Sequence, residues 1–411
     1  MSSSLRRRDP ADQRTDVIAQ FYDRHPYPPP ANLDAAAPRS ALERRAAHHL
    51  LWPARPVPET HRVLVAGCGT SQAVRHALLD PTAEVVGIDV SARSLEHSRR
   101  LVARHGVTNL ELRRLPIEDV AALGARFDHI VCTGVLHHLA DPAAGLQALR
   151  GVLAPGGAVT LMVYAPYGRA GVYLLQDYCR RLGVSTETAD IADLVATLRE
   201  IPPGHPISPL LRGTRDFADD DALADALLNP RDRAYSVPQL LELLEGAGLR
   251  MRRWARQAPY LPDCGSISET PHGRRIAELP AVEQHAALEL FRGTMLRHTV
   301  LAAAADDPGA EQPDPTDPEL AAARPIPSPT ALAVQEKDRL PPGIAAALLN
   351  RAHTETDLVL FVDAAELALF RRIDGERTIA ALGPGAPAFV RRLLRHDLVV
   401  LDASECAGMA P

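Results

Sequence analysis

Short apolar runs alternate with amphipathic stretches across residues 61–164. The apolar runs predict five strands, at 61–66, 84–89, 110–113, 127–133 and 158–164. The stretches between them predict helices, at 71–79, 91–105 and 142–153. Strands that alternate with helices through short connections favour a parallel sheet with right-handed crossovers.

Two further strands are predicted at 249–257 and 297–302, after an amphipathic helix that begins at Ser236 and ends at Glu245. The expected fold is therefore α/β, with a doubly wound, mostly parallel, seven-stranded sheet of Rossmann-like type. Residues 165–235 are less regular and rich in proline and acidic residues, and we expect them to form an inserted helical cap.

The chain divides into four expected parts. Residues 1–55 are an N-terminal cap or lid, and residues 56–304 are the main domain. Residues 305–330 are rich in alanine, aspartate and proline, which is typical of a solvated linker. Residues 331–411 are expected to form a small C-terminal α+β domain.

The composition and net charge limit the classes of molecule that the protein is expected to bind. The chain has 411 residues, of which 46% are hydrophobic, and a formal net charge of −6. The chain has no excess of basic residues that would indicate binding to nucleic acid. It also has no apolar run long enough to span a bilayer. We therefore expect a cytoplasmic protein that binds neither nucleic acid nor membrane. The five cysteines are scattered and predict neither a disulfide framework nor a zinc site.

The segment 63–71 reads Val-Leu-Val-Ala-Gly-Cys-Gly-Thr-Ser, follows a predicted strand and opens a predicted helix. Glycine lets the backbone turn sharply and approach a ligand closely, and amides at the helix N-terminus can face a polar or anionic group. The turn indicates a nucleotide-type ligand without specifying which one. Its candidate binding residues are Ala66, Gly67, Cys68 and Gly69.

Asp89 ends the second predicted strand, 20 residues after Gly69. A carboxylate at this position can accept hydrogen bonds from both hydroxyls of a ribose, in dinucleotide and adenosyl cofactors alike. The structural alternative is an acid at a helix N-terminus, because Ser91 begins the next helix.

Three later segments help to distinguish among the possible nucleotide-type ligands. They are residues 115–118 (Leu-Pro-Ile-Glu), 133–139 (Thr-Gly-Val-Leu-His-His-Leu) and 154–157 (Ala-Pro-Gly-Gly). In this order and spacing, together with the Gly-Cys-Gly turn, they resemble the class I S-adenosylmethionine-dependent methyltransferase family. The resemblance covers residues 60–165 by motif and extends more loosely to 304.

The resemblance implies S-adenosylmethionine as the cofactor and a role for each matching residue. The turn at Gly67 to Gly69 would lie beneath the methionine moiety, and Asp89 would hold the ribose. The other implied contacts are Val90, Ile117 and Glu118 for the adenine, and Thr133 and Gly134 for the methionine side.

Two positions depart from the family pattern. The first strand ends in Val65 and Ala66, where the family often has an acidic residue, and Ser71 stands where it usually has a glycine. Binding of the methionine ammonium group would then fall to backbone carbonyls instead of a strand carboxylate.

The resemblance places His137 beside the methyl group and the acceptor, and histidine suits a general base near neutral pH. The structural alternative is that one of the pair His137 and His138 orders the loop by bonding to backbone. Adjacent residues on an irregular loop rarely converge on one metal ion, and no carboxylate stands at ligand spacing. The sequence therefore predicts no metal.

Residues 21–30 (Phe-Tyr-Asp-Arg-His-Pro-Tyr-Pro-Pro-Pro) resemble an element that precedes some such methyltransferase domains. As a lid over the cofactor, it would place Tyr22 and His25 as catalytic candidates and Tyr27 as a substrate contact. The alternative is a packing arm whose aromatic residues fill a groove.

Further candidate substrate contacts follow the fifth strand. The segment that includes Tyr164, Tyr167 and Arg169 begins at the C-terminal end of this strand, where ligands bind in open α/β sheets. Tyr235 lies in another segment, which is able to reach the same end of the sheet. Each of these residues equally suits a loop anchored by an aromatic side chain.

Residues 358–402 are similar to small winged-helix modules that bind peptides, and the alternative is a structural or dimerising appendage. The expected function is transfer of a methyl group to a small-molecule or peptide acceptor, with a homodimer left open. Two other interpretations remain. The glycine turn and Asp89 also suit a nicotinamide-dependent oxidoreductase, whereas Val65 and Ser71 suit a cofactor-binding scaffold without catalysis.

Overall fold

The computed structural model describes residues 10–29, 31–213, 219–307, 313–336 and 340–406, with side chains from residue 17 onward. The chain separates into two compact units. The first contains Met1–Ala37, Thr60–Gly248 and Gly293–His298, and the second contains Pro38–Glu59, Leu249–Arg292 and Thr299–Pro411. Within the described residues, no helix is both long enough and apolar enough to cross a bilayer.

A seven-stranded sheet has the strand order β3-β2-β1-β4-β5-β7-β6. Strands β1 to β5 pair in parallel, and β6 and β7 pair antiparallel. The strands are β1 (His61–Ala66), β2 (Ala83–Asp89), β3 (Leu110–Arg114), β4 (Phe127–Thr133), β5 (Leu153–Tyr164), β6 (Leu249–Trp254) and β7 (Arg297–Ala304). The predicted fold class is confirmed.

Apolar runs and capping residues explain the local structure of the first unit. The last four residues of β1 are buried without alternation, which is typical of a parallel strand covered on both faces. Ser91 caps α4 by accepting a hydrogen bond from the Ser94 amide, and Gly106 ends that helix in the left-handed conformation. The helical elements around the sheet are α3 (Gln72–Leu79), α4 (Ala92–His105), η1 (Ile117–Leu123), η2 (Leu136–His138), α5 (Pro142–Gly151) and α10 (Val237–Gly246).

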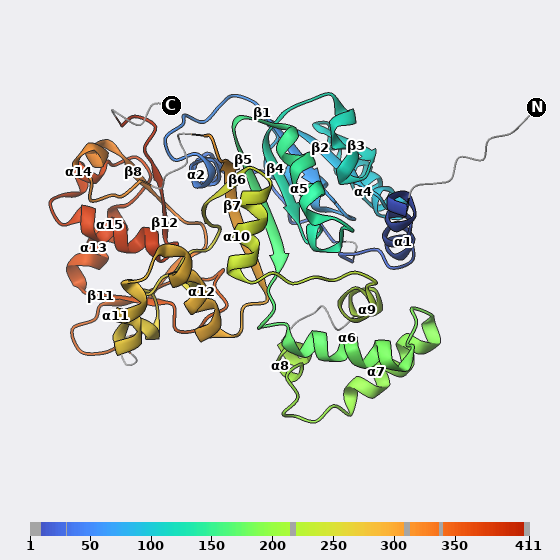
Figure 1. Cartoon of the computed structure of the whole chain (residues 1–411). Helices are drawn as coiled ribbons and strands as arrows, with labels where there is room; N and C mark the ends of the chain where they lie inside the picture. The colour runs from blue at the N-terminus through green and yellow to red at the C-terminus, as the bar shows by residue number, and fades with distance from the viewer. Residues whose placement is uncertain (1–9, 30, 214–218, 308–312, 337–339, 407–411) are drawn as a thin grey trace, which may run out of the picture. The chain divides into compact units, whose positions relative to one another are not determined.

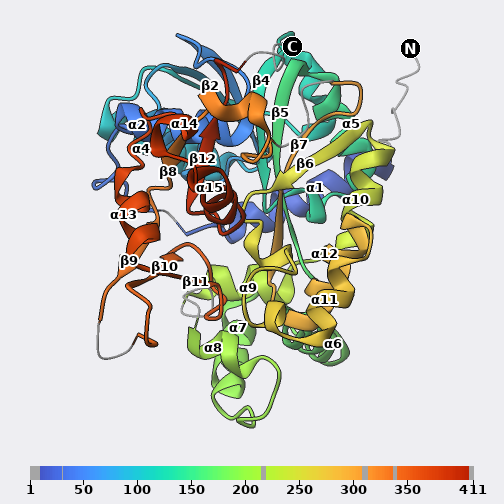
Figure 2. The same ribbon diagram turned by 90° about the vertical axis from the view of Figure 1, so that its left-hand side faces the viewer.

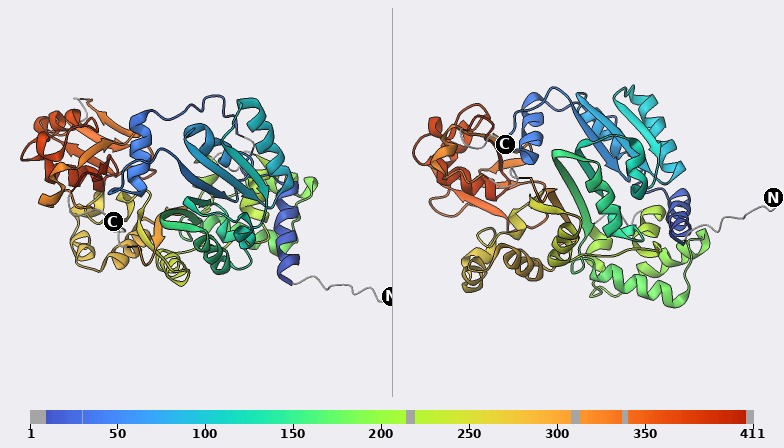
Figure 3. Two further views of the ribbon diagram at one scale, coloured as in Figure 1. Left: turned by 90° about the horizontal axis from the view of Figure 1, so that it is seen from above. Right: turned by 45° about the horizontal axis from the view of Figure 1, so that its top comes forward.

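The segment after β5 is helical and gathers around a core of its own. Its helices are α6 (Ala170–Leu182), α7 (Thr188–Arg199), α8 (Ser208–Gly213) and α9 (Asp220–Leu228), drawn in green in Figure 1. Val172, Leu175, Leu194 and Leu223 are buried together in this core, and Phe21 from the N-terminal segment joins them. The N-terminal helix α1 (Pro10–Arg24) packs beside α4, as Figure 3 shows.

The second unit contains two small sheets, of order β11-β10-β9 and β12-β8, and a set of short helices (Figure 2). Its strands are β8 (Arg324–Pro327), β9 (Ala331–Val334), β10 (Ala346–Asn350), β11 (Val359–Val362) and β12 (Val399–Asp402). Its helical elements are α2 (Ala41–Leu51), η4 (Ala258–Tyr260), η5 (Ser266–Glu269), α11 (Pro271–Ala277), α12 (Ala281–Arg292), η7 (Pro318–Ala322), α13 (Ala364–Arg372), α14 (Ile379–Leu382) and α15 (Ala386–Arg395).

Part of the segment 305–330, which we expected to be a solvated linker, is folded. Its last part forms η7 and β8, and Leu320 and Ala323 lie in the same buried core as Phe389 and Leu393. Strand β8 pairs with β12, so residues 331–411 share a sheet with the segment before them. A composition dominated by alanine and proline conceals the few apolar side chains that fold back onto the core.

Candidate functional site

The glycine turn joins β1 to α3 at the carboxyl end of the parallel strands. Gly67 has φ +70°, and a Cβ atom there would lie 2.3 Å from Cγ2 of Val135. The amides of Gly67 and Cys68 both donate to the carbonyl oxygen of Ile88, at 2.9 Å each. Only glycine combines this backbone conformation with so close an approach to a neighbouring loop.

The carboxylate of Asp89, at the end of β2, joins the two loops beside it. Its Oδ2 accepts a hydrogen bond of 2.8 Å from the Gly69 amide, and its Oδ1 accepts one of 2.8 Å from the Ser91 amide. Burial raises the pKa of Asp89, while these backbone hydrogen bonds oppose the rise. Because each carboxylate oxygen accepts more than one hydrogen bond, the group can still receive two hydroxyls.

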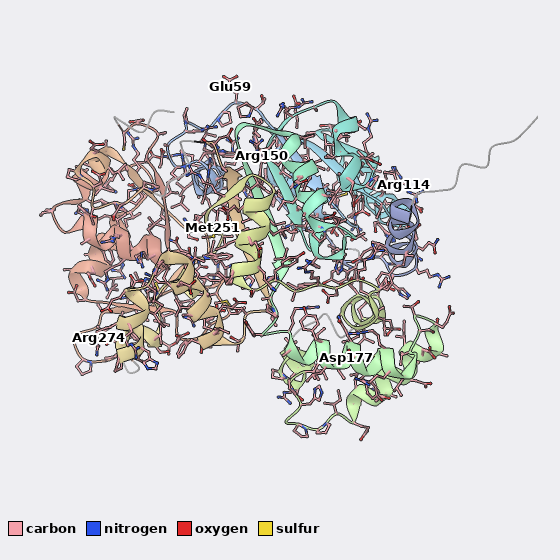
Figure 4. All side chains as sticks on the ribbon, in the orientation of Figure 1. Glu59, Arg114, Arg150, Asp177, Met251 and Arg274 are labelled. Carbon is pink, nitrogen blue, oxygen red and sulfur yellow. The ribbon has the colours of Figure 1, made fainter. Side chains whose placement is uncertain are left out.

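The other predicted cofactor contacts lie at neighbouring strand ends. Thr133 ends β4 and its Oγ1 accepts a hydrogen bond from the Gln72 side chain, and Gly134 follows with φ +78°. Val90 follows Asp89, and its carbonyl oxygen accepts a 3.0 Å hydrogen bond from Nε of Arg114. Arg114, the last residue of β3, is labelled in Figure 4.

The remaining members of this set differ in exposure. Ile117 is buried and Glu118 is exposed at the start of η1. Ala66 and Cys68 are fully buried, and burial raises the pKa of the Cys68 thiol well above its ordinary value. All five cysteines are free and buried, consistent with the absence of a disulfide framework predicted from the sequence.

Residues 21–28, hereafter the N-terminal arm, contact the glycine turn and the start of α4. Thr70 donates from Oγ1 to the carbonyl oxygen of Pro28 at 2.7 Å, and the Ser91 hydroxyl donates to Oδ1 of Asp23 at 2.7 Å. A Cβ atom on Gly69 would lie 3.0 Å from the carbonyl oxygen of Tyr27. The arm therefore lies directly against the predicted cofactor loop.

The same arm contacts helix α9. The Tyr22 hydroxyl donates to Oδ1 of Asp225 at 2.8 Å, and the Asn229 amide donates to that hydroxyl at 3.1 Å. Nδ1 of His25 lies 2.9 Å from Oδ1 of Asp221. Burial, followed by the charge of Asp225, raises the pKa of Tyr22 well above its ordinary value, so its phenol stays protonated at neutral pH.

The histidine pair in η2 is buried. His137 is 1% exposed, and neither of its ring nitrogens has a hydrogen-bond partner. Its ring centroid lies 4.2 Å from that of His138 and 4.1 Å from that of Tyr164. Burial holds the pKa of His137 well below its ordinary value, so the imidazole is neutral at physiological pH.

Tyr164 and Arg169 stack at the end of β5. The Arg169 guanidinium lies 3.6 Å from the Tyr164 ring centroid and donates to Oδ2 of Asp232 at 3.0 Å. Gln176 donates to the same oxygen at 2.9 Å. This arrangement places a buried arginine–aspartate pair next to the histidines.

Two predicted substrate residues lie outside this group. Tyr167 is 43% exposed. Tyr235 is buried and its hydroxyl has no hydrogen-bond partner, while the Arg233 guanidinium lies 4.9 Å from its ring centroid. The structure brings together Tyr22, His137, Tyr164 and Arg169, and their roles remain predictions.

The sequence pointed to neither Asp225 nor Asn229, and it did not place Asp232 beside the histidine pair. One ligand-type atom from each of His137, His138 and Asp232 lies within 4.8 Å of the others. The carboxylate comes from the segment between α9 and α10, so spacing along the chain gave no sign of it. The one sign of this contact in the sequence was that Asp232 lies near Tyr235, in a segment able to reach the C-terminal end of the strands.

Comparison with known proteins places these features in context. Residues 64–159 match the model of a family described as a methyltransferase domain. An uncharacterised protein of Synechococcus sp. is 33% identical over 262 residues, which are 61% of this chain and 63% of that protein. A ubiquinone biosynthesis O-methyltransferase of Leptothrix cholodnii is 36% identical over 101 residues, covering 24% of this chain and 43% of the relative. The chain thus spans less than two thirds of the length of either relative.

Among solved structures, the chain is similar to PKMT2 from Rickettsia typhi in complex with AdoHcy. The TM-score is 0.59 at 16% sequence identity, and the match covers 87% of this chain and 73% of that one. This likeness supports the fold. The similarity of residues 358–402 to winged-helix modules remains a prediction.

Proposed function

We propose that this chain, whose residues 64–159 belong to the methyltransferase domain family, transfers a methyl group from S-adenosylmethionine to a small-molecule or peptide acceptor. One observation carries the proposal: the Asp89 carboxylate lies 2.8 Å from the Gly69 amide. Ribose-binding and methionine-binding elements are thereby joined at neighbouring strand ends, as an adenosyl amino acid requires.

The cofactor would lie along the ends of β1, β2 and β4. Asp89 would accept hydrogen bonds from the ribose hydroxyls, and the glycine turn would let the backbone approach the methionine moiety. On the methionine side Thr133 ends β4, which pairs with β1, and Gly134 follows it. On the adenine side we assign Val90, Ile117 and Glu118. The solved neighbour from Rickettsia typhi, described as a complex with AdoHcy, supports a cofactor of this kind.

Methyl transfer breaks the bond between carbon and sulfur while the acceptor forms its bond to the same carbon. The enzyme contributes mainly by aligning the three atoms and excluding water. The N-terminal arm, held against both the glycine turn and α9, suits that role. A neutral His137 can accept the proton of a hydroxyl or amine acceptor, whereas Tyr22 is held as a hydrogen-bond donor to Asp225.

The acceptor would enter beside His137, Tyr164 and Arg169. Aromatic rings and a paired guanidinium suit an acceptor with an apolar body and a polar or anionic end. The relative from Leptothrix cholodnii, a ubiquinone biosynthesis O-methyltransferase, favours a small hydroxylated acceptor, and peptides remain the second class.

The strand order argues against a nicotinamide oxidoreductase. Dinucleotide folds have the parallel order 3-2-1-4-5-6. Here β7 is inserted between β5 and β6 and pairs antiparallel with β6.

Incubation with tritiated S-adenosylmethionine and a panel of phenols, amines, carboxylic acids and peptides tests the proposal. We expect label in one acceptor class and an equal yield of S-adenosylhomocysteine. Tight binding of NAD without binding of S-adenosylhomocysteine would contradict it. Cofactor binding with no transfer to any member of the panel would favour the scaffold interpretation instead.

A further inference from the structure

Three side chains of types that bind metal ions lie close together beside Tyr164 and Arg169. Each of His137, His138 and Asp232 offers one nitrogen or oxygen atom within 4.8 Å of the other two. The two histidines are 1% and 3% exposed, and the Asp232 side chain is 1% exposed. Burial of such polar side chains costs free energy unless their polar atoms have hydrogen-bond partners or bind an ion.

Backbone contacts on both sides of Asp232 hold it against the histidines. The carbonyl oxygen of Arg231 lies 2.5 Å from Nδ1 of His138. The amide of Arg233 donates to the carbonyl oxygen of His137 at 3.2 Å. The aspartate between these two residues is therefore fixed beside η2 by main-chain contacts rather than by its own charge.

The carbonyl contact also sets the tautomer of His138. A carbonyl oxygen can only accept, so Nδ1 of His138 carries the proton and donates to Arg231. In the neutral tautomer with this proton, Nε2 has a lone pair that can bind a metal ion. Histidines that bind metals have this arrangement, in which the second ring nitrogen donates to a carbonyl or carboxylate.

Three buried atoms in the cluster lack any hydrogen-bond partner. Both ring nitrogens of His137 are buried and unpartnered, and so is Oδ1 of Asp232. The other oxygen of Asp232, Oδ2, receives Arg169 and Gln176, which orient the carboxylate. Leaving such buried groups unsatisfied is unfavourable, and an ion bound in the cluster would take one nitrogen of His137 and Oδ1 of Asp232 as ligands.

The charges around the cluster are mixed. Arg169 opposes a cation, but it is paired with Asp232 and stacked on Tyr164. The Asp232 carboxylate therefore gives the ligand set a negative charge of its own.

We propose that His137, His138 and Asp232 bind a divalent transition-metal ion of the zinc type. Imidazole nitrogens favour zinc, iron or cobalt over magnesium and calcium, which prefer oxygen ligands. Ligand bonds of about 2.0–2.2 Å place tetrahedral ligands roughly 3.4 Å apart. Because the three ligand atoms lie within 4.8 Å of one another, they need to approach by at most about 1.4 Å on binding. A fourth position stays open for water or for a donor atom of the acceptor.

The inference goes beyond the proposed methyl transfer and does not depend on it. In the metal-bound protein His137 is a ligand, so the proton-accepting role proposed above applies to the metal-free protein. The glycine turn and Asp89 remain the cofactor site in both. Metal binding and binding of S-adenosylhomocysteine are therefore separate measurements, and either can fail alone.

The test is a titration of full-length protein, stripped with a chelator, by Zn²⁺ in a calorimeter and by Co²⁺ under visible absorption. We expect one ion per chain and the strong visible bands of cobalt bound by nitrogen and oxygen in a tetrahedral site. Asp232→Asn and His138→Gln should each weaken binding by more than about 100-fold, beyond the range for outer-shell changes. The matched controls His97→Gln, on α4, and Asp128→Asn, at the start of β4, should bind like the wild type.

Wild-type protein that binds no Zn²⁺ or Co²⁺, or that binds either as tightly after Asp232→Asn, would overturn the proposal. X-ray absorption of the zinc-loaded wild type supplies a readout independent of any variant's folding. Two imidazoles in the first coordination sphere are expected, and a spectrum without imidazole would also overturn it.

Discussion

The hydroxyl of Tyr22 donates a 2.8 Å hydrogen bond to Oδ1 of Asp225, although 203 residues separate them along the chain. The bond ties the N-terminal arm to helix α9. Because the same arm also receives the Thr70 hydroxyl at Pro28, it connects the glycine turn to the helical segment after β5. The arm is thus held in place by a few polar contacts.

Tyr22→Phe should lower the free energy of unfolding by about 1–2 kcal/mol, because Asp225 loses a buried donor. Urea denaturation measures this change. The control Tyr167→Phe removes a hydroxyl from a side chain that is 43% exposed and should change stability by less than about 0.5 kcal/mol. Equal effects of the two substitutions would show that the arm is not held by this bond.

Gly67→Ala should destabilise the protein more than Gly106→Ala. Both glycines have positive φ, at +70° and +63°, so both variants carry the backbone penalty of about 1–2 kcal/mol. At Gly67 the new methyl group also meets Val135 at 2.3 Å, whereas at Gly106 nothing lies within 4 Å.

Thermal unfolding of the two glycine variants measures the difference, and the Gly67 variant should also bind S-adenosylhomocysteine more weakly. Adding Val135→Ala to Gly67→Ala should recover the steric part of the loss only. Indistinguishable Gly67 and Gly106 variants would mean that the turn is not packed against the loop after β4.

The buried His137 predicts a specific pH dependence. Its folded-state pKa is depressed by burial, so below about pH 6.5 the unfolded chain takes up a proton that the folded chain resists. Stability should therefore fall as the pH drops from 7 to 5, by up to about 1.4 kcal/mol per pH unit from this residue.

In chelator-treated protein, His137→Gln should flatten the stability profile between pH 7 and 5 relative to the wild type. The other histidines with lowered pKa values, such as His285 and His396, are present in both proteins and cancel. Parallel profiles for the two proteins would show that His137 does not stay neutral in the folded state.

Local pattern was sufficient to predict most of the sheet. The bounds of β1 and β4 match the predicted runs at 61–66 and 127–133, because each strand contains a continuous buried apolar stretch, at 63–66 and 130–132. Ser91 and Gly106 mark the ends of α4 through hydrogen bonding and backbone conformation that act within a few residues. Such features depend little on the rest of the chain.

Contacts between distant segments were not predictable. Asp225 and Asp232 look like ordinary polar residues in the sequence, and they reach Tyr22 and the histidine pair only through the packing of the segment after β5. Strand β8 was missed because a four-residue strand gains its stability from its partner β12 rather than from its own pattern.

Calorimetric titration with S-adenosylhomocysteine of the wild type, Asp89→Ala and Asp128→Ala tests the central claim most directly. Both aspartates accept a 2.8 Å hydrogen bond from a backbone amide, but Asp128 does so at the start of β4, away from the strand ends that form the site. Loss of hydrogen bonds from the ribose to the Asp89 carboxylate should cost about 1.5–3 kcal/mol, or roughly 10- to 150-fold in affinity. The account predicts one molecule bound per chain, with that loss in the Asp89 variant alone. Unchanged affinity after Asp89→Ala, or no binding by the wild type, would contradict it.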